Sequence, residues 1–311
     1  MVAKRTTIVW AAIGGLACTD FSIDDADQGT MKPVVIEETF LQDPTPRVDV
    51  LWMMDNTLSM ELEQAHLRTN IDKFVSELDA HNVAWHIGVI TPDGQGILEG
   101  NPWVLTERNS TTDDLSDTLM VGLDGTLPQS GLAAIVSALS EPLVSTTNAG
   151  FRRNNAALHV IAYSDGDDQS DSLFGSNPVN AVLDLLNQEQ ERTGLPSTMS
   201  AVVGAAPSGC IGPYGGATAG ERYIAAAEQI GGLSSSICDP DLKAIAQDVT
   251  DISITLSDRF TLQAMPKPET VRVAIDGVRI DDGWTVNAQS ILFSMKPSYG
   301  ATIKIRYEVV Q

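Results

Sequence analysis

The feature that most constrains the fold is a set of three apolar runs, at residues 48–54, 83–91 and 158–163. A strand that is buried on both faces shows such a run, because neither of its sides meets water. Between the first two runs, apolar residues recur at helical spacing, at Leu67, Ile71, Phe74, Val75 and Leu78. Strands that alternate with helices predict the α/β class, with a doubly wound, mostly parallel sheet.

The last part of the chain has a different pattern. Apolar residues alternate with polar ones at 271–275 and 303–309, and Asp-Gly pairs at 276–277 and 282–283 supply hairpin turns. We therefore expect residues 258–311 to form a small antiparallel β module. Residues 32–44 also have strand character and are predicted to pair with it, which makes the α/β domain at 45–257 an insertion.

The charge is distributed in agreement with this division. The formal net charge is −22, yet from Phe260 onward six Lys and Arg face five Asp and Glu, a net of +1. A break in charge suggests a module boundary. The acidic balance also argues against binding nucleic acid, because phosphates require a basic face.

Two polar loops directly follow buried strands. Asp55, Thr57 and Ser59 stand at alternate positions after the first run, and Asp165 follows the third run and Ser164. Loops that leave parallel strands at the same edge meet in space, and ligands of such sheets bind there. Carboxylate and hydroxyl oxygens suit a hard cation such as Mg²⁺. Alternatively, Asp-x-Thr-x-Ser marks the capped start of a helix.

These residues resemble the metal-ion-dependent adhesion site of the von Willebrand factor A domain family, over about residues 45–257. Asp55 to Ser59 is similar to the family motif Asp-x-Ser-x-Ser, with Thr57 in place of the first serine. Thr126 matches the family's later threonine and Asp165 its later aspartate, although Ser130 could supply the hydroxyl instead of Thr126. The stretch Ser164–Ser170, following the arginines of Phe151-Arg152-Arg153, is similar to a bacterial lipoprotein-type subset, which often carries a late cysteine pair.

The resemblance implies a binding module, not an enzyme. Asp55, Thr57, Ser59, Thr126 and Asp165 would hold Mg²⁺, or Ca²⁺ or Mn²⁺, and a protein partner would complete the shell with a carboxylate. No Gly-x-Ser-x-Gly, Walker loop or HExxH motif is present in the sequence. The alternatives are a metal-dependent hydrolase that uses the same acidic pocket, and a structural surface protein with an idle site.

The first residues have the pattern of a targeting segment. Lys4 and Arg5 precede a short apolar stretch that ends at Cys18, and ten apolar residues are too few to span a bilayer. Residues 1–18 are thus predicted to be a signal peptide with a lipobox-like end, and 19–31 a flexible tether. This predicts an exported protein, lipid-anchored through Cys18 at the bacterial outer membrane or cell surface. Plain secretion, including to the periplasm, and a chance apolar start are the alternatives.

Two further cysteines remain, Cys210 and Cys238. In an exported chain the compartment is oxidising, which favours a disulfide between them. The alternative is a pair of free buried thiols. The sequence has no CxxC motif, which argues against a zinc site.

Overall fold

The computed structural model describes residues 33–42, 46–93, 95–175, 177–239, 242–253, 258–298 and 300–309. The chain divides into two compact units: unit 1 comprises Met1–Pro44 and Leu256–Gln311, and unit 2 comprises Thr45–Thr255. Unit 2 is thus an insertion between the two segments that make up unit 1. The predicted signal peptide, Cys18 and the tether lie outside the described residues.

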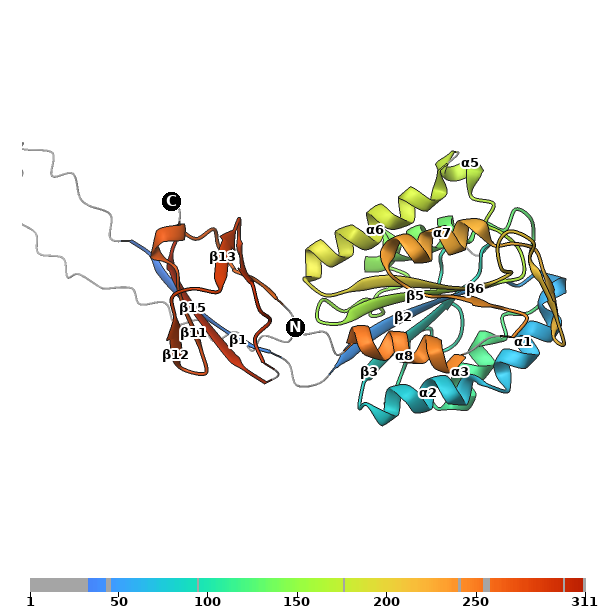
Figure 1. Ribbon diagram of the computed structural model, residues 1–311, viewed down its shortest axis with the longest axis horizontal. Coiled ribbons are helices and arrows are strands. Elements are labelled where there is room, and N and C mark those ends of the chain that lie inside the picture. Colours follow the sequence, from blue (N-terminus) through green and yellow to red (C-terminus); the bar gives the residue numbers. More distant parts are fainter. Residues whose placement is uncertain are drawn as a thin grey trace, which may run out of the picture. The chain divides into compact units, whose positions relative to one another are not determined.

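Unit 2 is built on a six-stranded sheet (Figure 1). Its strands, in spatial order, are β4 (Leu105–Thr106), β3 (Ala84–Ile90), β2 (Arg47–Met54), β5 (Ala157–Ser164), β6 (Ser197–Val203) and β9 (Ser234–Ser236). Neighbouring strands from β3 to β9 run parallel, whereas β4 runs antiparallel to β3. A separate antiparallel hairpin joins β7 (Cys210–Gly212) to β8 (Gly215–Ala217).

Helices cover both faces of this sheet (Figure 1). On one face lie α1 (Glu61–Arg68), α2 (Ile71–Ala80), α3 (Thr112–Leu119) and α8 (Leu242–Ser253); on the other lie α4 (Gly131–Leu139), α6 (Pro178–Thr193) and α7 (Glu221–Ile230). Short helical turns occur at η1 (Leu58–Met60), η2 (Leu143–Ser145) and α5 (Asp171–Phe174).

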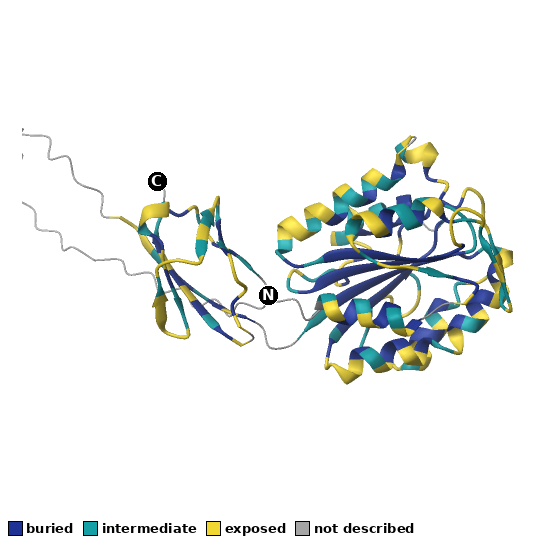
Figure 2. Cartoon of the chain, viewed as in Figure 1, coloured by how far each residue is buried: buried dark blue, intermediate teal, exposed yellow. Residues whose placement is uncertain are grey.

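Strand β2 shows why its apolar run is continuous. Successive side chains of a strand point to opposite faces. Trp52 packs edge-on against Phe74 of α2, with ring centroids 5.4 Å apart, while Leu51 and Met53 belong to the apolar cluster on the α4, α6 and α7 side. Both faces are buried, as the dark strands at the centre of unit 2 in Figure 2 show.

Unit 1 consists of two antiparallel sheets. The four-stranded sheet contains, in order, β1 (Val35–Leu41), β15 (Thr302–Glu308), β11 (Arg272–Ile275) and β12 (Val278–Ile280); the three-stranded sheet contains β10 (Arg259–Thr261), β14 (Ser290–Phe293) and β13 (Trp284–Asn287). The turn η3 (Pro268–Thr270) precedes β11. The core of unit 1 includes Phe40 of β1, whose ring packs against that of Phe260 of β10 at a centroid distance of 5.5 Å.

The fold class predicted from the sequence, a doubly wound, mostly parallel sheet with one small antiparallel module, is wrong. Over its described residues, the chain forms a mixed six-stranded sheet and three separate antiparallel sheets. Strand β4 runs antiparallel to β3, and the described residues between the two strands contain no helix of the kind that a parallel crossover needs. Strands β4, β7, β8 and β9 have only two or three residues each, too few for a period to appear in the sequence.

Among the described residues, no helix has the combination of length and apolar character that crossing a membrane requires.

Candidate cation site

The two predicted loops lie at the same edge of the six-stranded sheet. β2 and β5 are parallel neighbours that end at Met54 and Ser164, so the residues that follow them emerge together. The backbone N–H of Asp55 donates to the carbonyl of Tyr163 at 2.9 Å. Asp55 is buried, with 2% of its surface exposed. A buried carboxylate is costly unless its oxygens find donors or a cation.

Three donors hold the Asp55 carboxylate. The backbone N–H and the hydroxyl of Thr57 both donate to Oδ1, at 2.8 and 2.7 Å. The Ser164 hydroxyl donates to Oδ2 at 2.6 Å. The carboxylate is therefore fixed in direction; Oδ1 accepts two bonds and Oδ2 accepts one, so a lone pair remains on Oδ2.

Ser59 connects the first loop to Asp165. Its side chain lies near enough to Asp165 to lower the pKa of that carboxyl, and its hydroxyl is hydrogen-bonded to the Thr57 hydroxyl at 3.1 Å.

The electrostatics at Asp165 also favour a bound cation. Burial raises the pKa of Asp165 and the nearby Asp55 carboxylate raises it further, against the opposing hydrogen bond from Ser59. Two carboxylates brought together in a desolvated place disfavour each other's ionised form. A divalent cation removes this cost, which makes the pair a suitable donor set for one.

Thr126 is placed next to these loops but directed elsewhere. The N–H of Gly125 donates to the carbonyl of Asn56 at 2.8 Å, which brings its loop against the first loop. A side chain at Gly125 would lie 2.3 Å from the Asn56 amide oxygen, so only glycine permits this approach. The Thr126 N–H and hydroxyl donate to Asp93, at 3.0 and 3.4 Å. The structure therefore brings Asp55, Thr57, Ser59 and Asp165 together and turns the Thr126 hydroxyl toward Asp93.

Ser130, the alternative to Thr126, donates its hydroxyl to the carbonyl of Gln169 at 3.2 Å and is buried. It forms part of the start of α4. Asp168 accepts the N–H of Leu132 at 2.8 Å and Asp167 accepts the N–H of Arg222 at 3.0 Å, so these two carboxylates serve the starts of α4 and α7. The Asp168 side chain is buried.

Asp93 lies next to the candidate site, and the sequence analysis did not predict it there. It accepts the Asn56 side-chain N–H at 2.9 Å as well as the two bonds from Thr126. Burial alone would raise the pKa of Asp93, but the hydrogen bonds outweigh it and lower the pKa. The signal was present in the sequence, because Pro92-Asp93 follows the second apolar run just as Asp55 follows the first.

Glu63 was also missed, since a glutamate within a helical pattern normally faces water. Here it lies on α1 with 1% of its surface exposed, and its Oε2 has no hydrogen-bond partner in the described part of the chain. Burial raises the pKa of Glu63, and the Asp165 and Asp55 carboxylates add to this, against its own backbone hydrogen bond. Unpartnered buried oxygens are rare. The Asn56 amide oxygen beside this edge is another buried oxygen with no hydrogen-bond partner among the described residues.

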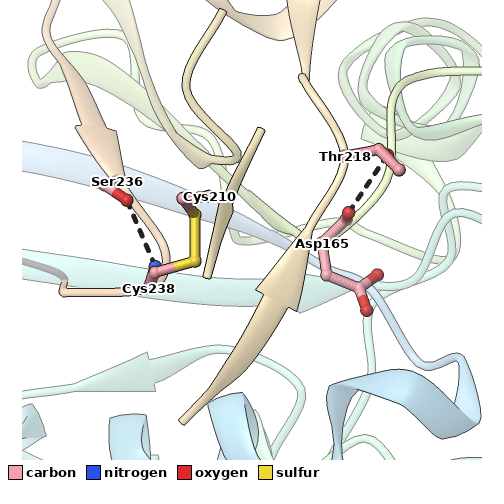
Figure 3. Close-up of a disulfide and its surroundings, with 5 residues drawn as sticks. All are labelled: Asp165, Cys210, Thr218, Ser236 and Cys238. Atoms are coloured by element: carbon pink, nitrogen blue, oxygen red, sulfur yellow. Dashed lines mark hydrogen bonds between the residues drawn. A yellow bond between two sulfur atoms is a disulfide. The ribbon is translucent and has the colours of Figure 1, made fainter. Parts of the chain in front are cut away.

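The cysteines form the predicted disulfide, which is confirmed: Cys210 and Cys238 have an S–S distance of 2.05 Å and a Cα–Cα distance of 6.1 Å. The bond ties the β7–β8 hairpin to the segment after β9, and the chain leaving the hairpin binds the second loop (Figure 3). The Thr218 N–H donates to the Asp165 carbonyl at 2.9 Å. The disulfide is thus linked, through a short stretch of backbone, to a candidate cation ligand.

The residues present fit a cation that keeps several waters. No group of three or more His, Cys, Asp or Glu side chains in metal-binding proximity occurs in the described ranges. The donor set instead combines two carboxylates with two hydroxyls, and Mg²⁺ is commonly held through one or two carboxylates and water. A structural zinc site, which needs four Cys, His or acid ligands, does not match this set.

Comparison with known proteins gives no family assignment. No protein-family model matches the chain, and no curated protein matches it. Two solved structures of the pilus adhesin SpaC from Lactobacillus rhamnosus GG are similar at low level. The first has a TM-score of 0.39 and 10% sequence identity, and the match covers 90% of this chain and 42% of the other. The second, in an open conformation, has a TM-score of 0.37 and 11% sequence identity, and the match covers 90% of this chain and 41% of the other. The chain thus spans less than half of those proteins, and neither fold nor function is assigned from this similarity.

Proposed function

We propose that unit 2 binds a divalent cation at Asp55, Thr57, Ser59 and Asp165, and that the cation mediates recognition of a protein partner. The observation that carries the proposal is the proximity of Asp55 and Asp165 after two neighbouring parallel strands, with the Ser59 side chain beside Asp165 and its hydroxyl hydrogen-bonded to that of Thr57. In the adhesion sites that these residues resemble, the cation is coordinated incompletely by its own chain. A partner carboxylate would then complete the shell.

The chain's own residues supply position and charge. Asp55 and Asp165 provide two negative charges, which Mg²⁺, Ca²⁺ or Mn²⁺ would balance. Thr57 and Ser164 keep the Asp55 carboxylate in one orientation. Gln64 of α1 donates to the Asp55 carbonyl at 3.0 Å and fixes the loop backbone from the other side. The site is therefore organised before a cation or partner arrives, which lowers the cost of binding.

The test is the melting temperature of unit 2 with and without millimolar Mg²⁺. We expect Mg²⁺ to stabilise the wild-type protein, because a ligand that binds the folded state stabilises it by mass action. Asp55→Ala should abolish this response, and Asp165→Asn should weaken it. Asp79→Asn, which removes an exposed carboxylate of α2, is the matched control and should respond as the wild type does. A wild-type protein that does not respond to Mg²⁺, Ca²⁺ or Mn²⁺ would refute the proposal.

We further propose that the protein is exported and anchored through a lipid on Cys18. The support is the basic start at Lys4 and Arg5 followed by a short apolar stretch that ends at this cysteine. Mass spectrometry of the mature N-terminus, purified from bacterial membranes, tests it. A first residue other than a lipid-modified Cys18 would contradict the anchor.

A further inference from the structure

Glu63 of α1 is a buried carboxylate that the proposed cation site does not yet use. Only 1% of its surface is exposed, and its Oε2 has no hydrogen-bond partner among the described residues. Burying a glutamate is costly unless its oxygens find donors, because they lose their hydration. Buried oxygens without a donor are rare in folded proteins, and a bound water or ion commonly accounts for them. The free oxygen of Glu63 therefore indicates a ligand that the chain itself does not supply.

Two hydrogen bonds hold this turn of α1 against the two strand ends that carry the acidic ligands. The Gln64 side chain donates to the carbonyl of Asp55 at 3.0 Å. The hydroxyl of Tyr163, which stands two residues before Asp165, donates to the carbonyl of Glu63 at 3.3 Å. The turn of α1 that contains Glu63 is thus attached to the first loop and to the end of β5, from which the second loop emerges.

The β7–β8 hairpin packs on the Glu63 carboxylate. A side chain at Gly215 would lie 1.8 Å from Oε1, so the backbone of this glycine lies directly against the carboxylate. Three residues further along, the Thr218 N–H donates to the carbonyl of Asp165 at 2.9 Å (Figure 3). The stretch from Gly215 to Thr218 therefore contacts both Glu63 and the second acidic loop, and it excludes water from the Glu63 side chain.

The charge of Glu63 lies within electrostatic reach of the cation ligands. Burial raises the pKa of Glu63, and the Asp165 and Asp55 carboxylates raise it further. A cation at the site would interact with this third carboxylate as well, with the opposite sign. However, no three acidic, His or Cys side chains form a metal-binding group over the described ranges, so the three carboxylates do not all ligate one ion directly. Contact between Glu63 and the ion is left to a water molecule.

Divalent cations differ in how firmly they hold water. Mg²⁺ demands near-octahedral geometry and gives up its waters reluctantly, whereas Ca²⁺ takes about six to eight oxygen ligands in a flexible shell. Two carboxylates and two hydroxyls occupy four positions, so an octahedral ion keeps about two further positions for water or a partner. Groups just outside a metal's ligands commonly hydrogen-bond to what the metal binds and tune its affinity. A fixed carboxylate in that position favours the ion that keeps its water.

We propose that Glu63 makes this site select Mg²⁺ over Ca²⁺, by accepting a hydrogen bond from a water molecule bound to the cation. Glu63 is a positioning residue, because it acts through that water and does not touch the ion. The bound water supplies the donor that Oε2 lacks within the described chain. The inference rests on the proposed cation site, to which it adds the identity of the ion and the residue that determines it.

The experiment is isothermal titration calorimetry of the full-length chain with MgCl₂ and, separately, with CaCl₂. We expect the wild type to bind Mg²⁺ more tightly than Ca²⁺. Glu63→Gln should weaken Mg²⁺ binding by about tenfold, the lower end of what outer groups contribute to metal affinity, because a neutral amide accepts a hydrogen bond less strongly than a carboxylate. Its affinity for Ca²⁺ should change by less than about twofold, since that ion depends less on the water.

Glu61→Gln is the matched control. Glu61 stands in the first turn of the same helix and is exposed, so the substitution removes the same charge from α1 at the surface. A general electrostatic effect would appear in both variants and for both cations, whereas exposed charges are screened by salt. We expect Glu61→Gln to bind each cation as the wild type does.

Glu63→Asp keeps the charge but withdraws the carboxylate by one methylene group, and it should also lose the preference for Mg²⁺. This variant tests the proposal if Glu63→Gln does not fold. Unchanged Mg²⁺ affinity in a folded Glu63 variant overturns the proposal. Equal losses for Mg²⁺ and Ca²⁺, together with a lower melting temperature without a cation, also overturn it, because they would show a structural role only.

The wild type alone separates this inference from the proposed function. If it binds Ca²⁺ as tightly as Mg²⁺ or more tightly, selection by Glu63 fails and the cation site stands. If it binds neither Mg²⁺ nor Ca²⁺ and Mn²⁺ does not stabilise it, the cation site itself fails, and the inference fails with it.

Discussion

At the scale of single residues, unit 2 contains polar groups buried at a cost that their neighbours offset. His159 of β5 is fully buried, and its ring nitrogens lie 2.7 Å from the Thr198 hydroxyl and 3.1 Å from the Ser200 hydroxyl. A hydroxyl can donate to one ring nitrogen and accept from the other, so the neutral imidazole is satisfied. Burial lowers the pKa of His159 to about 3. It is therefore a core histidine.

This burial predicts a loss of stability in mild acid. The pKa of His159 lies below its unfolded value of 6.5, so its contribution is present above pH 6.5 and lost as the pH falls toward 3. Between pH 7 and pH 5 the wild type should lose about 2 kcal/mol of unfolding free energy from this group. His159→Gln keeps hydrogen-bonding capacity but does not titrate, so its stability should fall less over the same interval. Urea unfolding of both proteins at the two pH values measures the difference, and equal losses would exclude His159 as the cause.

A buried, charged residue lies near the end of β2 that is opposite the candidate site. Asp49 is fully buried and accepts hydrogen bonds from Arg152 at 2.9 Å and from Arg153 at 2.6 and 2.7 Å. Removing one partner of a buried pair leaves the other uncompensated, at a cost of about 3–5 kcal/mol. We expect Asp49→Ala to lower the unfolding free energy of unit 2 by this amount. Asp113→Ala, on the exposed side of α3, should change it by less than about 0.5 kcal/mol in the same denaturant titration.

At the scale of elements, the β7–β8 hairpin connects the disulfide with both sides of the candidate site. Gly215 lies so close to the Glu63 carboxylate that a side chain there would be 1.8 Å from Oε1. Tyr214 in the hairpin turn stacks on His66 of α1, with ring centroids 3.6 Å apart. Together with the bond from Thr218 to Asp165, these contacts attach the hairpin to α1 and to the second loop.

Removing the disulfide should therefore affect stability and the cation response together. In the chain-entropy model, a bond that closes a loop of 28 residues contributes about 3–4 kcal/mol. The double variant Cys210→Ser/Cys238→Ser should lose about that much unfolding free energy, and its melting temperature should rise less with Mg²⁺ than that of the wild type. Thermal and denaturant unfolding measure both. A variant with full Mg²⁺ response would show that the hairpin does not position Asp165.

The elements also show how far the sequence could be interpreted. The long buried strands are visible in it, since β2, β3 and β5 lie at the three apolar runs and Asp55 and Asp165 stand where two of them end. The fold class was not visible in the sequence, because it is decided by strands of two or three residues whose pairing depends on distant neighbours. Glu63 could not be predicted either, because a helical pattern does not reveal that a hairpin 150 residues later covers it.

At the scale of the whole molecule, the two units have separate cores. Unit 1 is closed by β1, which pairs along its full length with β15 near the other end of the chain, from Val35 opposite Glu308 to Leu41 opposite Thr302. Its buried cluster includes Phe40, Phe260 and Ile305, and the two clusters of unit 2 contain none of these residues. Cooperative unfolding depends on shared packing. Two separate cores thus predict two unfolding transitions.

Phe260→Ala tests this separation. Phe260 is fully buried and its ring packs against Phe40 and Phe293, so its truncation should cost about 3–5 kcal/mol in unit 1 alone. In calorimetry, the unit 1 transition should move to lower temperature while the other transition stays in place. Mg²⁺ should have the opposite selectivity, raising the unit 2 transition only, because the proposed ligands all belong to that unit. A single transition that responds to both changes would show that the units unfold as one, and that a cation bound in unit 2 also stabilises the sheet formed by β1 and β15.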